Sequence, residues 1–231
     1  MSEVTGAVLL RCGNCLEDLH GLPDDSIFLC GNCGRAWLSG PEGLEEVGVS
    51  LYGEAGEGRV FLPFWRVEAD VTLRERTTRR QETSTVATAP RQFSRNAERG
   101  LRTESGRRVL RSYIVPAVVN GRALSLGVAL RAARPDLLPY HGTPPVMVGG
   151  SVDAEDAAEM ARAIAVGEEV ARTDFLASLD IDLEPMDTDL MGIACLAGEK
   201  GFEVPGTGVL LRYPDTEDYR GILQRNGLSA G

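Results

Sequence analysis

Apolar and polar residues alternate most regularly between positions 65 and 73. The apolar positions of this stretch are Trp65, Val67, Ala69, Val71 and Leu73, and the positions between them are Arg66, Glu68, Asp70 and Thr72. Successive side chains of a β-strand point to opposite faces of its sheet, so this pattern predicts a strand with one buried face. Pro63 cannot donate a hydrogen bond to a neighbouring strand, which favours a strand start or a sheet edge there.

Three further apolar runs predict strands later in the chain. They cover residues 109–119, 190–197 and 208–213, and the last two are separated by a turn-like segment and a Pro-Gly stretch.

Two segments show helical character instead. Residues 122–134 carry apolar side chains at helical spacing and stop before Pro135, as the steric clash with a following proline requires. Either Ser151 or Asp153 can cap a helix over residues 152–175. The first turn of this segment is acidic, and negative charge is favourable beside the exposed N–H groups at the start of a helix. We expect one long helix over 152–175, and a short helix over 215–227.

Four of the five cysteines lie in two copies of the tetrapeptide CGNC. These ligand candidates are Cys12, Cys15, Cys30 and Cys33. Fourteen residues separate the two pairs, enough for a strand, a turn and a returning strand, and close to the spacing of tetrahedral zinc sites. Four thiolates leave no open position for water, so we expect structural rather than catalytic Zn²⁺. A rubredoxin-like iron site and a dithiol redox pair are the alternatives.

The two CGNC motifs and the ending CGNCGRAW resemble the zinc-ribbon family. The resemblance covers only residues 1–40, and it implies a fold and a metal but no particular function. Leu16 stands where these ribbons commonly have glycine, and Gly13 and Gly31 stand where they commonly have proline. The order of a ribbon, the sequence LPFWRV and a larger body is also similar to uncharacterised bacterial zinc-ribbon proteins.

These patterns predict an α+β protein in two parts. We expect a small zinc ribbon at 1–40, a Gly- and Glu-rich linker at 41–58, and a body at 59–231. The body should contain a mixed or mainly antiparallel sheet, the long helix and a basic hairpin arm at 74–111.

The arm stands out by its charge. The chain has a formal net charge of -10, but residues 74–111 hold eleven arginines and four glutamates, which gives +7 there and -17 elsewhere. Arginine suits phosphates and carboxylates, so any anionic partner should be sought at this segment. The candidate contact residues are Arg79, Arg80, Arg91, Arg95, Arg107 and Arg108. The arm is interpreted as a hairpin that extends the flanking strands or as a disordered insertion, and the acidic remainder of a second copy is one candidate partner.

The remaining candidate groups favour structural roles. Cys195 lies in an apolar run, so we expect a buried thiol rather than a nucleophile paired with His141. Asp180, Asp182 and Glu184 would share one face of a strand, where they could hold Ca²⁺ or Mg²⁺ or form a solvated acidic edge that discourages strand pairing.

The sequence favours a binding protein over an enzyme. No run approaches the roughly 18 apolar residues of a membrane helix, and the first residues lack the character of a signal peptide. We therefore expect a cytoplasmic, non-catalytic zinc protein that binds a protein partner or assembles with itself. Nucleic-acid binding through the ribbon and the arm is the alternative.

Overall fold

The computed structural model describes residues 10–79, 101–118, 121–133, 135, 137–142 and 147–212. The central part of the predicted arm, with Arg80, Arg91 and Arg95, and the helix predicted at 215–227 lie outside these ranges.

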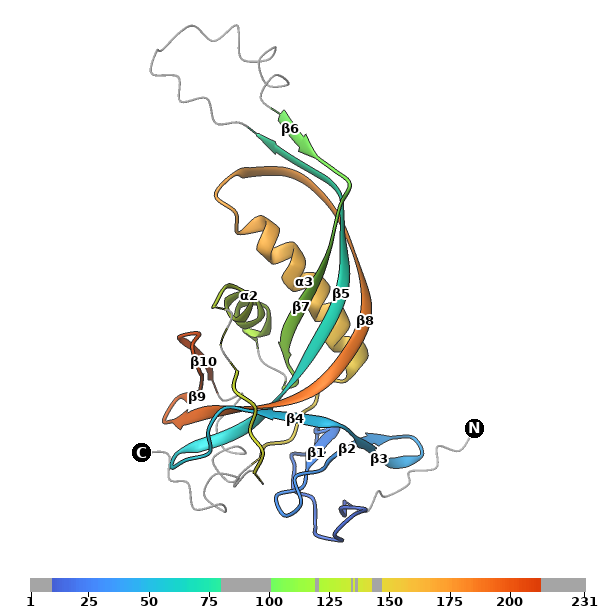
Figure 1. The fold of residues 1–231 in the computed structure, drawn as a ribbon, viewed down its shortest axis with the longest axis vertical. Coiled ribbons are helices and arrows are strands. Elements are labelled where there is room, and N and C mark those ends of the chain that lie inside the picture. Colours follow the sequence, from blue (N-terminus) through green and yellow to red (C-terminus); the bar gives the residue numbers. More distant parts are fainter. Residues whose placement is uncertain are drawn as a thin grey trace, which may run out of the picture.

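Two long antiparallel strands form a tall, curved sheet (Figure 1). β5 (Arg59–Arg79) and β8 (Phe175–Gly198) pair along nearly their full lengths. The alternation predicted for residues 65–73 is confirmed, because its apolar members are buried and its polar members are half-buried. One face of this sheet therefore carries the core of the body.

Five shorter strands complete the seven-stranded sheet. β7 (Arg107–Pro116) and β6 (Leu101–Glu104) pair with β5, while β9 (Gly201–Val204) pairs with β8 and β10 (Val209–Arg212) with β9. All of these pairs are antiparallel. The one exception among these strands is β4 (Val49–Tyr52), which pairs with β8 in parallel. The expectation of a mainly antiparallel sheet is therefore confirmed.

Two helices lie on the concave side of the sheet (Figure 1). α2 (Ala123–Ala133) has 11 residues and α3 (Ala154–Val170) has 17. Asp153 caps α3, because its side chain accepts a hydrogen bond from the backbone N–H of Asp156. Neither helix, within the part of the chain that the structure describes, is long and apolar enough to cross a membrane.

The expectation of one long helix over 152–175 is wrong. α3 ends at Val170, and the chain then turns into β8, which begins at Phe175. Ion pairing stabilises this turn, because the carboxylate of Asp174 accepts two hydrogen bonds from Arg76 of β5.

The core of the body lies between α3 and the strands. Trp65 of β5 and Tyr113 of β7 pack there with Ile164 of α3 and Leu183 of β8. The indole Nε1 of Trp65 donates a hydrogen bond to the carbonyl oxygen of Val152, so its one polar atom is satisfied.

A separate three-stranded sheet carries the cysteines. It consists of β1 (Ile27–Leu29), β2 (Ala36–Gly40) and β3 (Gly43–Val47) in antiparallel order. The structure thus places β3 and β4 in the segment 41–58, for which we expected a linker. Leu44 and Val47 pack on neighbouring apolar residues, and this burial stabilises β3. The strand was not predicted because glycine and glutamate dominate the sequence around these two residues.

The small sheet is joined to the body through backbone hydrogen bonds and a shared core. The N–H groups of Ser26 and Ile27 donate to the carbonyl oxygen of Gly150, and Gly150 N–H donates back to Ile27. A Cβ at Gly150 would lie 2.7 Å from the carbonyl oxygen of Ala117, so only glycine allows this approach. The domain boundaries that we predicted stay predictions, but this contact holds the two parts together.

An irregularity at Arg74 changes which side chains of β5 face the helix. Leu73 lies opposite Ile181 and Glu75 opposite Asp180, so Arg74 is an extra residue in the strand. Such a bulge reverses the alternation beyond it. Arg76 therefore turns toward α3 and is buried, although simple alternation from Leu73 would have placed Glu75 there.

Candidate metal centre and charged surfaces

The two CGNC motifs form turns with the same backbone hydrogen bonds. Cys12 N–H donates to Glu17 and Leu16 N–H donates to Cys12, while Cys30 and Gly34 repeat these bonds in the second turn. Each turn directs its pair of sulfur atoms toward the other pair. The local sequence thus builds two matching knuckles, and the β1–β2 hairpin brings them together.

The four sulfur atoms lie close enough to share one metal ion. All lie within 4.8 Å of one another, and the Sγ atoms of Cys12 and Cys33, and those of Cys15 and Cys30, are 3.5 Å apart. Zn–S bonds of about 2.3 Å in a tetrahedron would place sulfurs about 3.8 Å apart. These thiols are free, and their separations fit a shared cation far better than disulfide bonds of about 2.05 Å.

The pKa values of the Cys12 and Cys30 thiols are shifted in opposite directions. Burial opposes ionisation of Cys12, but hydrogen bonds from the backbone of Cys15 and Asn14 outweigh it and lower the pKa of the thiol to about 6. Burial dominates at Cys30 and raises its pKa to about 12. A cation among the sulfurs would stabilise all four thiolates together, and its binding would release protons.

Trp37 covers the first knuckle. Its ring packs so closely that a Cβ at Gly13 would lie 2.6 Å from the indole, so glycine is the residue that fits there. Trp37 also packs with Leu19 and Phe28 in the small core around the cysteines. The aromatic residue that ends CGNCGRAW therefore covers the cysteine cluster on the side of the first knuckle.

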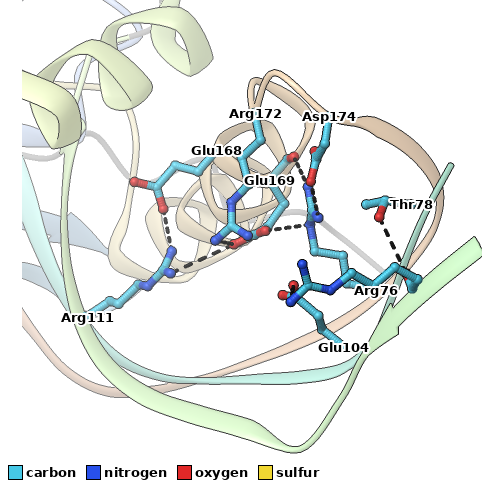
Figure 2. A network of polar contacts seen from close by, with 9 residues as sticks. Arg76, Thr78, Glu104, Arg111, Glu168, Glu169, Arg172 and Asp174 are labelled. Atoms are coloured by element: carbon cyan, nitrogen blue, oxygen red, sulfur yellow. Dashed lines mark hydrogen bonds and ion pairs between the residues drawn. The ribbon is translucent and has the colours of Figure 1, made fainter. Parts of the chain in front are cut away.

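A second polar site joins β5 and β7 to the end of α3 (Figure 2). Arg76 is 1% exposed and donates two hydrogen bonds, of 2.6 and 2.7 Å, to the carboxylate of Asp174. Its Nε lies 3.0 Å from Glu169, which is 3% exposed. Hydrogen bonding to Arg76 lowers the pKa of Asp174. Neither Arg76 nor Glu169 was a sequence candidate, because only the bulge and the turn after α3 reveal their contact.

Most of the arginines that the structure describes in the Arg-rich segment are paired with carboxylates. The structure describes seven of its arginines, and five of these form ion pairs with described carboxylates. The five are Arg74, Arg76, Arg102, Arg108 and Arg111. Arg79 and Arg107 are exposed and form no ion pair with any described residue. The net charge of the segment therefore overstates the positive charge that is available to a partner.

The acidic run contributes to this neutralisation. Asp180, Asp182 and Glu184 lie on β8, and the carboxylate of Asp182 accepts a hydrogen bond of 2.6 Å from Arg74. Between Phe175 and Asp189, β8 pairs only with β5 among the described strands, so its other side is an edge. The acidic run thus lies on a strand whose other side is unpaired among the described strands, which is the arrangement of the acidic-edge interpretation.

Three exposed side chains meet at the far end of the sheet. Leu101 of β6 and Phe175 of β8 lie opposite Arg79 of β5 on either side of it, so the three share one face. Leu101 is 45% exposed and Phe175 is 54% exposed. We call these residues the distal row. The sequence did not single out Leu101 or Phe175, because each is a lone apolar residue beside polar ones.

Cys195 is a buried structural thiol, as expected. It has no exposed surface, and burial raises its pKa. Its sulfur contacts the carbonyl oxygen of Ile193, within the same strand.

Comparison with known proteins adds no assignment. No protein-family model, no curated protein and no solved structure matches this chain. The inferences that follow therefore rest on the geometry of the chain itself.

Proposed function

We propose that the four cysteines hold a structural Zn²⁺ ion and that the protein is a non-catalytic binding or assembly component. Zinc is supported by the donor set, since four thiolates suit Zn²⁺ and fill its tetrahedral shell. The metal would fix the two knuckles, and through β1 it would also fix the contact of the ribbon with the body at Gly150.

The distal row is the observation that carries the binding proposal. Leu101, Arg79 and Phe175 present an aliphatic, a cationic and an aromatic side chain together at the end of a long, curved sheet (Figure 1). Aromatic residues and arginine are the types that contribute most to protein–protein interfaces. A partner that buried this row would remove from water apolar surface that is exposed among the described residues.

A nucleic-acid partner is the second candidate. It is favoured by the exposed positions of Arg79 and Arg107, and it is weakened by the ion pairing of the neighbouring arginines. Base stacking would depend on an aromatic side chain such as Phe175, which lies beside Arg79.

Native mass spectrometry of the full chain, purified from cells with its partners, tests the proposal. The variants Leu101→Ser and Phe175→Ser remove the apolar side chains of the distal row. Leu110→Ser is the matched control, because Leu110 is also an exposed leucine, on β7 at a different place in the sheet. We expect both row variants to lose a protein partner or self-association that the control retains.

Other outcomes separate the candidates. Equal association by the control and both row variants would remove the distal row from the proposal. Co-purifying nucleic acid would favour the second candidate. The logarithm of its binding constant should then fall by about 0.7 to 0.9 per phosphate contact for each tenfold rise in salt concentration.

A further inference from the structure

A cavity of ≈ 420 Å³ lies beside the end of α3, apart from the cysteines and the distal row. Three arginines from three different elements line it: Arg111 of β7, Arg131 of α2 and Arg172 from the turn after α3. Glu168 and Glu169 of α3 form the rest of its charged lining. Figure 2 shows Arg111, Arg172 and both glutamates converging on this region.

The glutamates hold the arginines in position. Arg111 donates to Glu168 at 2.6 Å, and Arg172 donates to Glu169 at 3.0 Å. Arg131 lies 3.3 Å from Glu168, and its guanidinium stands over the ring of Tyr113, 5.9 Å from the ring centre. Each arginine is thus oriented by a contact on one side, as a binding site for a ligand requires.

Hydrogen-bond donors exceed acceptors in this cavity. Each guanidinium carries five N–H donors and no acceptor. The glutamates take up only part of them, through hydrogen bonds from Arg111 and Arg172. The Nε of Arg131 is buried and has the carboxylate of Glu168, 3.3 Å away, as its ion-pair partner, and Arg111 also lies 3.8 Å from Glu169.

The Tyr113 hydroxyl belongs to the same group of side chains. Tyr113 is fully buried on β7, two residues after Arg111 and therefore on the same face of the strand. Burial raises the pKa of its phenol, and a hydrogen bond with Arg111 and the positive charge of that residue oppose the rise. Tyr113 thus places one more polar group beside Arg111 and Arg131.

Formal charge points in the same direction. The lining contains three arginines and two glutamates, and the adjoining pair of Arg76 with Asp174 adds one charge of each sign. The negative ends of the α2 and α3 dipoles offset part of this excess. A ligand that completes the site should therefore be anionic and rich in acceptors.

We propose that this cavity binds a small oxyanion, a carboxylate or phosphate group, through the guanidinium groups of Arg111, Arg131 and Arg172. Planar guanidinium forks match the oxygens of both groups in pairs. The cavity falls within the range of roughly 300 to 1,000 Å³ typical of small-molecule sites, so the anion can be part of a larger metabolite.

Calorimetric titration of the full-length protein with inorganic phosphate and with malonate tests the proposal. Ionic strength is held constant with chloride, because general screening would otherwise imitate binding. We expect saturable binding of one anion per chain with a dissociation constant of about 1 mM or tighter. The tighter of the two anions identifies the phosphate or the carboxylate as the preferred group.

Arg131→Gln is the main variant, since this residue is held by one ion pair and one ring contact. Loss of a charge-assisted hydrogen bond should weaken binding by about 10-fold or more. Arg131→Lys keeps the charge without the fork and should bind with intermediate affinity. Arg108→Gln is the matched control, because Arg108 is another arginine in an ion pair, on β7, and it does not line the cavity. The control should bind as the unmodified protein does.

Two results would overturn the proposal. One is the absence of saturable binding by either anion, which would leave the arginines with a structural role alone. The other is an equal loss of affinity in Arg131→Gln and Arg108→Gln, which would show general electrostatic attraction. If Arg131→Gln fails to fold, as judged by near-ultraviolet circular dichroism, Arg172→Gln replaces it, because Arg172 is a more exposed lining residue.

Discussion

Leu16 and Gly34 occupy the same position in the two cysteine knuckles, and both have a positive φ, 62° and 73° respectively. Each donates its N–H to the first cysteine of its own motif. Glycine adopts this conformation without strain, whereas a side chain makes it cost about 1 to 2 kcal/mol. Leu16 is 71% exposed, so burial within the chain does little to offset this cost.

Replacing Leu16 by glycine should therefore stabilise the protein. We expect Leu16→Gly to raise the free energy of unfolding by on the order of 1 kcal/mol, after the larger backbone entropy of glycine in the unfolded chain is counted. Gly34→Ala should lower it by a similar amount, because it introduces the same strain into the second knuckle. Urea unfolding of the metal-loaded protein measures both, and a destabilised Leu16→Gly variant would contradict this account.

Removing one cysteine ligand should abolish stoichiometric zinc. We expect Cys33→Ser to lose the metal and to unfold at a lower temperature, since binding of structural zinc contributes directly to folding. Cys195→Ala is the control, because that buried thiol lies on β8 and is not one of the four clustered cysteines. Inductively coupled plasma mass spectrometry gives the metal per chain. Full zinc occupancy in Cys33→Ser would show that the cluster is not the site.

Arg76 and Glu169 should depend strongly on each other. Arg76→Met leaves the carboxylate of Glu169 buried with one partner fewer, which should destabilise the protein by about 3–5 kcal/mol. Adding Glu169→Leu should recover part of the loss, because removing both buried charges costs less than removing one. A double-mutant cycle by urea unfolding measures the coupling. Additive effects would show that the two side chains act independently.

Asp25 should make the protein less stable as the pH rises above the usual carboxyl range. Burial raises the pKa of Asp25, so the folded state binds its proton more tightly than the unfolded chain does. Its contribution to stability is complete below a pKa of about 3.9 and is lost as the pH rises through the raised value. Asp25→Asn keeps an oxygen that can accept the hydrogen bond from Leu22 N–H and removes the titration.

The difference in unfolding free energy between Asp25→Asn and the unmodified protein tests this expectation. It should grow in favour of the variant between pH 4 and neutrality, as measured by urea unfolding at several pH values. Other carboxylates titrate in both proteins and cancel in the difference. A difference that stays constant with pH would show that the Asp25 proton has no role.

Local sequence was sufficient for features that depend on near neighbours. The repeated CGNC motif specifies two similar turns, because its spacing and its hydrogen bonds lie within a few residues. The alternation over 65–73 specifies a strand with a buried face for the same reason. The buried state of Cys195 followed from the apolar residues on either side of it.

Tertiary structure alone decided what depends on distant partners. β5 pairs with β8 across about a hundred residues, and no short pattern contains that register. The bulge at Arg74 then turns Arg76 inward, where Glu169 and Asp174 neutralise it. The sequence by itself therefore determined the four cysteines that cluster and the apolar face of the sheet. Only the folded chain decided which arginines are paired, which line the cavity and which are exposed, because a charge is neutralised through space and not along the chain.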